Sequence, residues 1–499
     1  MTAADEPEPG KAAVDQAVVD KTAADRAPAN TAKFLHGPLM RHVVVMSLSA
    51  SVGLLSIFIV DFVDLFFISL LGEAALAAAV GFAGTILFFN MSATIGLMIA
   101  MGALAAQRIG RGEPEEARRI ATSVIAVGLV IGAALGAATW AFAPQFLSAL
   151  GAVGETKDFA VSYLRIVTPT LPVMVLAMVS SGLLRAHGDA RRAMNATLAA
   201  GLVNAVLDPI LIFGLFFMPA LGLDGAAYAS AAARFAMAGA ALYPVIKHYG
   251  GFAPFDGNAL RRDLAPIFAI AAPAILTNVA TPVGNFIVTR AIAPYGDAAM
   301  AGYSVIGRLT PLAFCVIFAL SGAVGPIIGQ NFGAGNFSRV RTALMRALQF
   351  TAGYTVLVWI VLVALQGSIV ETFGLRDLGA TLVFWFAVVI TPLFFFNGVL
   401  FVANASFNNL NRPVWSTMLN WGRNTVGAAP FAFVGGALAG APGVLIGHAL
   451  GGVLFAALGA VVCLRLINAY ETGRADPGKG WKITLMRPRP TPPFSSPRA

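Results

Sequence analysis

The chain has 499 residues, of which 58% are hydrophobic and only 11% are charged, with a mean hydropathy of +0.78. Soluble domains carry about 25% charged residues, so this composition excludes an ordinary water-soluble protein and indicates that lipid surrounds most of the surface. The net charge of +9 therefore predicts basic loops beside a membrane, and we expect no nucleic-acid partner. The two cysteines stand in apolar segments without metal-ligand spacing, so neither a disulfide framework nor a metal site is expected.

The apolar segments predict twelve membrane-spanning helices. Residues 1–37 come first; they are Ala-rich, carry mixed charge and lack an apolar signal-peptide core, so we expect a disordered tail. A helix needs about 20 apolar residues to cross the hydrocarbon core, and stretches of this length then recur. Residues 471–499 end the chain as a second flexible tail that is Pro-rich and basic. The predicted spans are 41–69, 75–106, 119–142, 159–184, 194–217, 225–246, 264–292, 299–328, 344–366, 379–404, 414–434 and 443–466.

Basic residues alternate between the loops on the two sides of the predicted membrane. Loops after odd-numbered spans hold only Lys157 and Arg376, whereas loops after even-numbered spans hold fifteen Arg and Lys residues. Loops rich in Lys and Arg stay in the cytoplasm, so the pattern predicts a multi-pass protein of a bacterial inner (plasma) membrane with both termini cytoplasmic. The fifteen residues are Arg108, Arg111, Arg118, Arg119, Arg185, Arg191, Arg192, Lys247, Arg261, Arg262, Arg339, Arg341, Arg346, Arg412 and Arg423.

The two halves of the chain repeat each other. Residues 107–112 read Gln-Arg-Ile-Gly-Arg-Gly, and residues 330–335, at a shift of 223, read Gln-Asn-Phe-Gly-Ala-Gly. Pro209 matches Pro430 at a shift of 221. Because six spans per half is an even number, the halves share their orientation and are related by an axis along the membrane normal. This arrangement predicts two bundles that rock against each other, which is typical of secondary transporters and not of enzymes.

Four segments along this frame resemble motifs of one transporter family, the multidrug and toxic compound extrusion (MATE) family. They occur in the order in which the family has them, and the likeness runs from about residue 40 to residue 465. The segments are residues 64–78, residues 107–112 with their counterpart 330–336, residues 184–191 (Leu-Arg-Ala-His-Gly-Asp-Ala-Arg) and residues 204–209 (Asn-Ala-Val-Leu-Asp-Pro).

The resemblance implies an all-α integral membrane protein with a V-shaped fold, in which residues 38–250 and residues 251–470 form two pseudo-symmetric six-helix bundles. It also implies an antiporter that exports cationic or amphipathic small molecules, such as drugs and toxic metabolites, and that binds no cofactor other than its coupling ion, H⁺ or Na⁺. We expect a monomer in the lipid bilayer. Some members place acids in spans 7 and 10, where this chain has Thr281 and Phe395. The chain is therefore nearest the DinF-like subgroup, which favours H⁺ over Na⁺.

Three acids, Asp61, Asp64 and Asp208, lie inside the predicted spans, and all three are in the first half. A charged side chain at mid-bilayer costs on the order of 3 kcal/mol, so such residues are rare and usually functional. Helix rise places the three at about the same depth, and Asn204 lies one turn from Asp208 on the same face. Carboxyl groups that share a buried pocket can exchange protons near neutral pH. We therefore expect these four residues to form the ion-coupling site.

Arg234, in the sixth span, lies at a depth similar to that of Asp208. We expect its guanidinium to pair with the Asp208 carboxylate and to tune the coupling site, leaving Asp64 as the proton carrier. A fixed ion pair that only ties spans 5 and 6 together is the structural alternative.

The second half offers uncharged polar groups inside its spans. These groups could line a substrate cavity or could simply form hydrogen bonds between helices. The aromatic run Phe394–Phe396 would suit flat amphipathic substrates or would pack toward lipid. The candidate cavity residues are Asn278, Asn285, Asn397, Asn404 and Phe396.

Three other functions compete with antiport. The closest is a lipid-linked oligosaccharide flippase of the same superfamily, although such proteins often have fourteen spans and a basic central cavity. A membrane-embedded enzyme would need an Asp-rich metal motif or a long catalytic loop, and neither is present in the sequence. A channel would more often be an oligomer with few spans in each chain.

Overall fold

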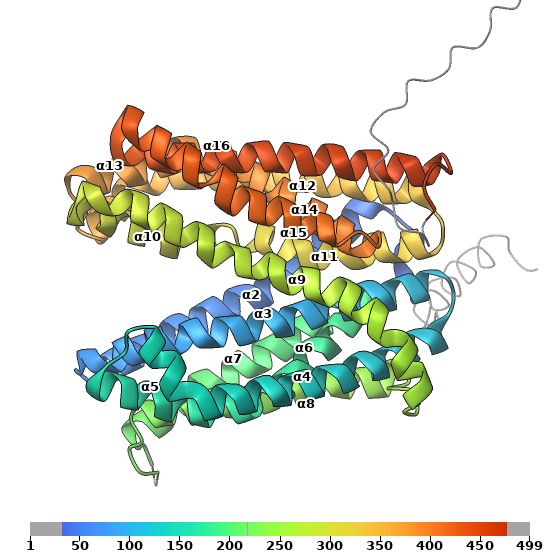
Figure 1. The fold of residues 1–499 in the computed structure, drawn as a ribbon, viewed down its shortest axis with the longest axis horizontal. Helices are drawn as coiled ribbons and strands as arrows, with labels where there is room; N and C mark the ends of the chain where they lie inside the picture. Colours follow the sequence, from blue (N-terminus) through green and yellow to red (C-terminus); the bar gives the residue numbers. More distant parts are fainter. Residues whose placement is uncertain (1–31, 217, 477–499) are drawn as a thin grey trace, which may run out of the picture.

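The computed structural model describes residues 32–216 and 218–476, and every regular element in these ranges is helical (Figure 1). Residues 1–31 and 477–499, which include most of the two expected tails, lie outside the described residues. The first half contains α2 (Leu39–Ser69), α3 (Ala74–Gly110), α4 (Pro114–Ala149), α5 (Gly154–Val167), α6 (Leu171–Ala186), α7 (Ala190–Phe213) and α8 (Leu223–Tyr249).

The second half has the same number of spans but more breaks. It contains α9 (Gly257–Ile292), α10 (Asp297–Ala313), α11 (Cys315–Gly333), α12 (Phe337–Thr372), α13 (Asp377–Trp385), the π-helical turn η4 (Phe386–Ile390), α14 (Thr391–Asn409), α15 (Val414–Gly422), the π-helical turn η5 (Arg423–Gly427) and α16 (Ala429–Glu471).

The described residues contain twelve spans, as the sequence predicts. Eleven segments are long and apolar enough to cross a membrane, and the last of them, Val414–Glu471, reverses direction where Ala439 and Gly440 leave helical geometry. A Cβ atom on Gly451 would overlap the carbonyl oxygen of Gly427 on the opposite arm of this hairpin. Such close antiparallel contact makes the segment two spans, and the expectation of an all-α, twelve-helix membrane fold is confirmed.

Prolines and polar caps explain where several helices begin and break. The 3₁₀ turn Thr168–Thr170 separates α5 from α6 and contains a proline that cannot donate a backbone hydrogen bond. Helices α7, α9 and α12 begin at caps whose side chains accept a backbone N–H from the first turn. These caps are Asp189, Asp256 and Asn336.

The helices form two groups, with α2–α8 in the lower part of Figure 1 and α10–α16 in the upper part, while α9 runs from the lower right into the upper group. The groups contact each other chiefly through α2 and α3 on one side and α9 and α11 on the other. The first turns of α9 also pack against α4, so the second half begins on the surface of the first. This arrangement makes α3, α9 and α11 the elements that any rocking of the halves would have to move.

One end of the molecule holds all the turns that follow even-numbered spans, and we call it the junction end. These turns are residues 111–113, 187–189, 250–256, 334–336 and 410–413. It also holds both ends of the described chain, because Phe34 donates its backbone N–H to Gln330 and the Tyr470 ring lies 5.5 Å from that of Phe332. Residues 32–37, expected within the disordered tail, are instead packed here: Lys33–Leu35 form a 3₁₀ turn and Phe34 is fully buried. The apolar Phe34 side chain explains this correction, since it enters the core beside Leu39 and Val43.

The structure also corrects the placement of one of the fifteen basic residues. Arg423 begins the π-helical turn η5 and therefore lies inside the eleventh span and not in the loop before it. It was assigned to a loop because an Arg within an apolar run gives no sequence signal for its depth. Arg185, in contrast, lies in the last turn of α6, with its Nη1 atom 3.5 Å from the sulfur of Met98 on α3.

Candidate coupling site and the contacts between the halves

The helices α2 and α7 pack side by side in the first half. Gly201 allows them to approach closely, because a Cβ atom at this position would lie 2.6 Å from the Ser56 hydroxyl. Two turns further along both helices, this contact brings Asp64 of α2 to Asp208 of α7. The absence of a side chain at Gly201 thus allows the close packing that brings the two acids together.

Asp64 and Asp208 lie close enough for their carboxyl groups to hydrogen-bond each other. Two carboxyl groups can form such a bond only when one of them carries a proton. Asp208 is completely buried, and Asn204, one turn away on α7, donates its amide to Asp208 Oδ1 at 3.4 Å. The remaining oxygens, Asp64 Oδ1 and Asp208 Oδ2, accept no hydrogen bond from any described residue. These two oxygens can therefore accept a proton or a hydrogen bond from an additional donor.

Asp61 lies one turn before Asp64 on α2 and is exposed. It interacts with Asp64 through its charge, and no hydrogen bond to it is found among the described residues. Of the four expected coupling residues, the structure thus brings Asp64, Asp208 and Asn204 into direct contact and leaves Asp61 at the edge.

Arg234 does not pair with Asp208, and the expectation of that ion pair is wrong. Its Nη1 atom donates instead to the Val167 carbonyl oxygen at 2.8 Å and to Thr170 Oγ1 at 2.9 Å. These groups lie at the break between α5 and α6, where the 3₁₀ turn frees a carbonyl group that would otherwise stay unpaired. Similar depth on neighbouring spans does not fix the direction of a long side chain, which is why sequence reasoning misplaced it.

Tyr163 is a neighbour of the site that sequence reasoning missed. This residue of α5 lies within electrostatic reach of Asp64, Asp208 and Arg234, and its hydroxyl group hydrogen-bonds to Ser230 of α8. Tyr163 is thus a common neighbour of the acids and the guanidinium. A tyrosine inside an apolar span carries no recognisable motif, so only the packing of α5 on α8 could reveal it.

Three candidate cavity residues of the second half make no hydrogen bonds to one another among the described residues. Asn278 donates its amide to Ala274 of its own helix at 2.9 Å, and Asn285 is exposed. Asn397 is partly buried on α14. These three side chains are therefore not joined into a single polar site by any hydrogen bond among the described residues.

Asn404 and Phe396 belong to the packed interior of the second half. The side chain of Asn404 is buried and accepts the amide of Asn420 at 3.0 Å, so it connects α14 with α15. Phe396 packs against the core and meets the neighbouring Phe395 edge to face, with ring centroids 5.3 Å apart. Packing between helices, the plainer of the two expected roles, accounts for both side chains.

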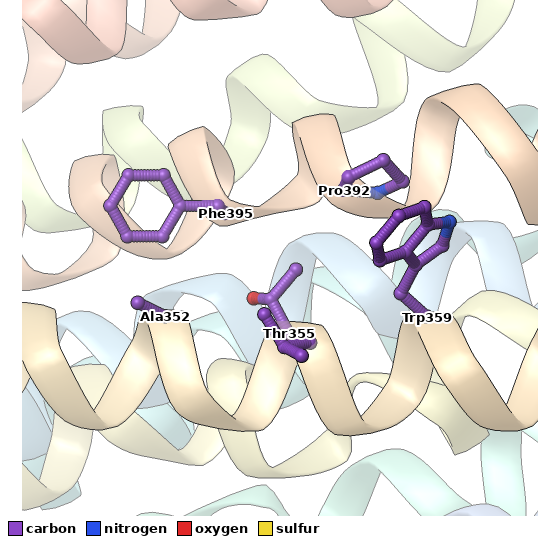
Figure 2. A pocket seen from close by; sticks show the side chains of 6 residues that line it. Ala352, Thr355, Trp359, Pro392 and Phe395 are labelled. Carbon is purple, nitrogen blue, oxygen red and sulfur yellow. The ribbon is translucent and has the colours of Figure 1, made fainter.

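Phe395 instead points into a surface groove of about 190 Å³ between α12 and α14 (Figure 2). Trp359 closes one end of the groove and donates its indole N–H to the Val388 carbonyl oxygen. The other lining residues are Ala352, Thr355, Val356 and Pro392. The groove is almost entirely apolar, as expected where lipid chains cover a membrane protein.

Paired glutamines join the two halves at the junction end. Gln107 of α3 donates its amide to the Asn409 carbonyl oxygen and to Asn411 Oδ1, both at 3.0 Å. Gln330 of α11, its counterpart in the repeat, donates to the Ala186 carbonyl oxygen at 2.8 Å. Each glutamine therefore bonds the opposite half, and the motif that marks the repeat in the sequence is a contact between the halves in the structure.

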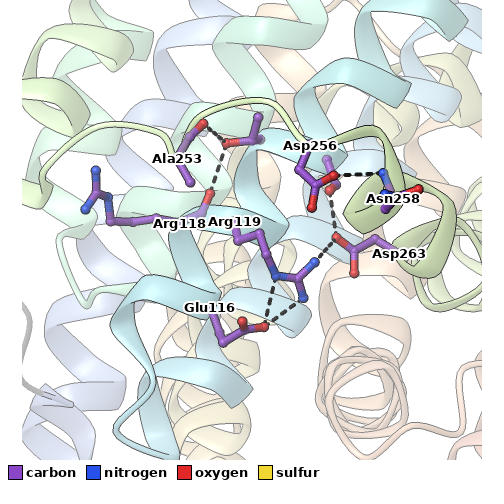
Figure 3. Close-up of polar contacts among 9 residues, drawn as sticks. Glu116, Arg118, Arg119, Ala253, Asp256, Asn258 and Asp263 are labelled. Carbon is purple, nitrogen blue, oxygen red and sulfur yellow. Dashed lines mark hydrogen bonds and ion pairs between the residues drawn. The ribbon is translucent and has the colours of Figure 1, made fainter.

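An ion pair reinforces this contact (Figure 3). Arg119 of α4 donates to Asp263 of α9 at 2.8 Å, and the Ser123 hydroxyl donates to the same carboxylate oxygen at 2.6 Å. The Asp263 side chain is only 5% exposed, so the pair is shielded from solvent on one side. Glu116 holds the other edge of the guanidinium. The junction end is thus closed by directional bonds as well as by apolar packing.

Known proteins resemble the chain over most of its length. The MatE family model matches residues 50–210 and 273–434, one match in each half. The FAD transporter of Shewanella oneidensis is 28% identical over 447 residues, which cover 89% of this chain and 98% of that protein. Multidrug export protein MepA of Staphylococcus haemolyticus is 25% identical, over 89% of this chain and 97% of its own.

Solved structures show the same fold. The crystal structure of a single-residue mutant of the MATE transporter VcmN of Vibrio cholerae superposes with a TM-score of 0.81, and the match covers 86% of this chain and 97% of that chain. The two sequences are 21% identical. The likeness extends over both helix groups, so it includes their relative arrangement as well as each bundle.

Proposed function

The chain belongs to the MatE family of membrane transporters, and we propose that it is a secondary active antiporter that exports cationic or amphipathic small molecules in exchange for protons. The observation that carries this proposal is the contact between Asp64 and Asp208. A proton shared by two carboxyl groups is bound in one state and released in another, which is what coupling requires. Multidrug export is the printed activity of the MepA relative and supports the substrate class.

In this mechanism the proton and the substrate use the same pair of acids at different times. When Asp64 and Asp208 lose the shared proton, two like charges remain side by side and the helices α2 and α7 must separate or gain a counter-charge. A cationic substrate supplies that counter-charge, and protonation from the opposite side of the membrane expels it. Tyr163 and Arg234 keep α5 and α8 against the acids during this exchange.

We propose that the junction end faces the cytoplasm of a bacterium and that the protein works as a monomer in the inner membrane. The concentration of Arg and Lys in the turns at this end supports that orientation. Since the glutamine and ion-pair contacts close the junction end, the described conformation would be the one that opens to the outside. Alternating access would then require these contacts to break in each cycle.

Flavin nucleotides are a second candidate for the substrate. The match to the relative named FAD transporter covers almost the whole length of that protein. A dinucleotide with a flat ring and phosphate groups is therefore a second candidate substrate for this chain. Flavin nucleotides are amphipathic, like the first candidate substrates, but their phosphate groups make them anionic and not cationic.

Transport into proteoliposomes tests the proposal. Purified protein, reconstituted with an imposed pH gradient, should accumulate a fluorescent amphipathic cation against its gradient, and a proton ionophore should abolish the accumulation. A parallel survey of drug susceptibility in cells that overexpress the protein, with and without the ionophore, would identify substrates. Accumulation that depends on Na⁺ and ignores the ionophore would overturn proton coupling.

A further inference from the structure

Two basic side chains, Arg423 and His448, lie inside the spans of the second half. Arg423 begins the π-helical turn η5, and His448 lies on α16 beyond the reversal of the chain. Gly452, one turn after His448, faces the guanidinium, because a Cβ atom on it would lie 3.5 Å from Arg423 Nε. The charge of Arg423 also acts on the His448 imidazole. The two bases therefore form one cluster between the arms of the hairpin.

No acid balances this cluster among the described residues. Arg423 Nε and His448 Nδ1 are buried and have no hydrogen-bond partner there. Buried charged groups in proteins are ordinarily paired. The acids of the described second half all lie within about two turns of a helix end or in turns, and none forms an ion pair with Arg423. They are Asp256, Asp263, Asp297, Glu371, Asp377, Glu471 and Asp476.

The surroundings of the cluster are polar and locally distorted. Asn424 donates its amide to the Asn420 carbonyl oxygen at 2.9 Å, and Asn420 in turn donates to Asn404. A π-helical turn is rare and is frequent at functional sites, and here it begins at Arg423 itself. Both basic side chains keep some exposed surface, although Arg423 Nε and His448 Nδ1 themselves are buried.

Arg423 lies near the positions of the second half that correspond to Asn204 and Asp208 of the first. The shift of 221 that matches Pro209 with Pro430 places the equivalents of Asn204 and Asp208 at Thr425 and Ala429. Arg423 precedes the first of these by two residues, on the same span. The fifth span of the first half thus carries the acid Asp208, and the corresponding span of the second half carries the base Arg423.

We propose that Arg423 and His448 form an anion site that binds the phosphate or carboxylate group of an amphipathic substrate. The inference rests on the proposed transporter function and, between its two candidate substrates, favours the flavin nucleotides over a cation, because the site would bind an anionic group. Guanidinium and imidazolium groups both donate hydrogen bonds to such oxygens, and the guanidinium can do so with two parallel N–H bonds. An anionic lipid headgroup offers the same chemistry from a second source.

Equilibrium binding of two flavins tests the site without any gradient. Flavin mononucleotide and riboflavin differ only in a phosphate group, and the quenching of their fluorescence reports binding to protein in phosphatidylcholine nanodiscs. We expect the mononucleotide to bind about tenfold more tightly, since a charge-assisted bidentate contact is worth about 1.4 kcal/mol or more. Arg423→Gln should remove this preference. Arg308→Gln, which removes an exposed arginine from α10 of the same half, should retain it.

Further variants keep the test decisive if Arg423→Gln fails to fold. Arg423→Lys retains the charge but loses the bidentate geometry, and His448→Gln removes the second base; each should reduce the preference for the mononucleotide about threefold. Equal binding of both flavins by the wild-type protein, or an undiminished preference in Arg423→Gln, would overturn the anion site. Because no pH gradient enters these measurements, loss of proton coupling cannot mimic either result.

Nanodiscs of different lipid distinguish the two sources of the anion. If a headgroup occupies the site, phosphatidylglycerol should compete with flavin mononucleotide, and native mass spectrometry should show the bound lipid disappear in Arg423→Gln. If the site serves soluble substrates, exchange of the lipid should leave the affinity for the mononucleotide unchanged. Either pattern supports the anion site, whereas phosphatidylglycerol that binds equally to wild type and Arg423→Gln assigns the lipid to another surface.

Discussion

Gly110 lies directly against the backbone of Gln330, so closely that a Cβ atom on the glycine would overlap the glutamine carbonyl oxygen. The converse contact also exists, because a Cβ atom on Gly333 would overlap the carbonyl oxygen of Gln107. Gly110 and Gly333 are equivalent in the repeat, as are the two glutamines. The contact is therefore reciprocal, which is what a two-fold axis between the halves requires at the point where it passes.

A methyl group at Gly110 should open the junction end. Gly110→Ala cannot be accommodated without moving α3 away from α11, so the population of junction-closed molecules should fall. Distances between spin labels placed on the α3–α4 and α11–α12 turns would measure this change. Gly81→Ala is the matched control, since it lies on the same helix with no neighbour within 4 Å. Identical distance distributions in Gly110→Ala and wild type would contradict the reciprocal contact.

Asp64→Asn should abolish transport driven by a pH gradient while leaving the protein folded. Asparagine keeps the size of the side chain but cannot carry the shared proton to Asp208. Transport in proteoliposomes over a range of pH is the measurement, and Asp208→Asn should impair it strongly as well. Substitution of Thr281, which lies on α9 away from the acids, should leave coupling intact. Wild-type rates with an unchanged pH dependence in Asp64→Asn would rule out this site.

Arg234 should couple energetically to Thr170 and not to Asp208. Arg234→Gln breaks a bond to Thr170 and another to a backbone carbonyl group, which should cost about 1–3 kcal/mol of stability. A double-mutant cycle with Thr170→Val, measured by thermal unfolding in detergent, should show less than additive destabilisation. The cycle with Asp208→Asn should be additive. The reverse pattern would show that the guanidinium reaches the acids after all.

The ion pair between Arg119 and Asp263 should stabilise the closed junction. Asp263→Asn leaves the guanidinium with a weaker partner in a mostly buried position and should cost about 1–3 kcal/mol. Labelling of a cysteine placed in the 250–256 turn should become faster in this variant. Glu116→Gln removes only the more exposed partner of Arg119 and should cost less than about 1 kcal/mol. Equal effects of the two substitutions would show that the pair is not specific to the junction.

Periodic signals in the sequence predicted the fold better than they predicted the site. Hydropathy, loop charge and the 223-residue repeat each average over many positions, so twelve spans followed even though one of the fifteen basic residues, Arg423, was misplaced. The acids Asp64 and Asp208 were found because a charge inside an apolar run is conspicuous. Helix rise predicted their shared depth, whereas their contact depends on the close packing of α2 on α7.

The remainder of the site depends on contacts that have no periodic signal. The direction of the Arg234 side chain is set by a free carbonyl group at a break between α5 and α6, and that break depends on local backbone geometry. Tyr163 is recognisable only through its neighbours on other helices. Phe34 looked like part of a polar tail because its binding partners, Gln330 and Asn331, are almost 300 residues away in the sequence.

Glycines line the contact between the two arms of the Val414–Glu471 hairpin and limit how the second half can deform. They are Gly427, Gly435, Gly443, Gly447 and Gly451. At these contacts the backbones of the two arms touch directly, so no side chain lies between them that could adjust its rotamer when the arms shift. We therefore expect the two arms to move together as one rigid unit. A rigid-body rotation of the hairpin moves Arg423 and His448 together and keeps the distance between them fixed. The bending that opens or closes the second half therefore has to occur elsewhere, and the break between α10 and α11 at Phe314 is a natural pivot.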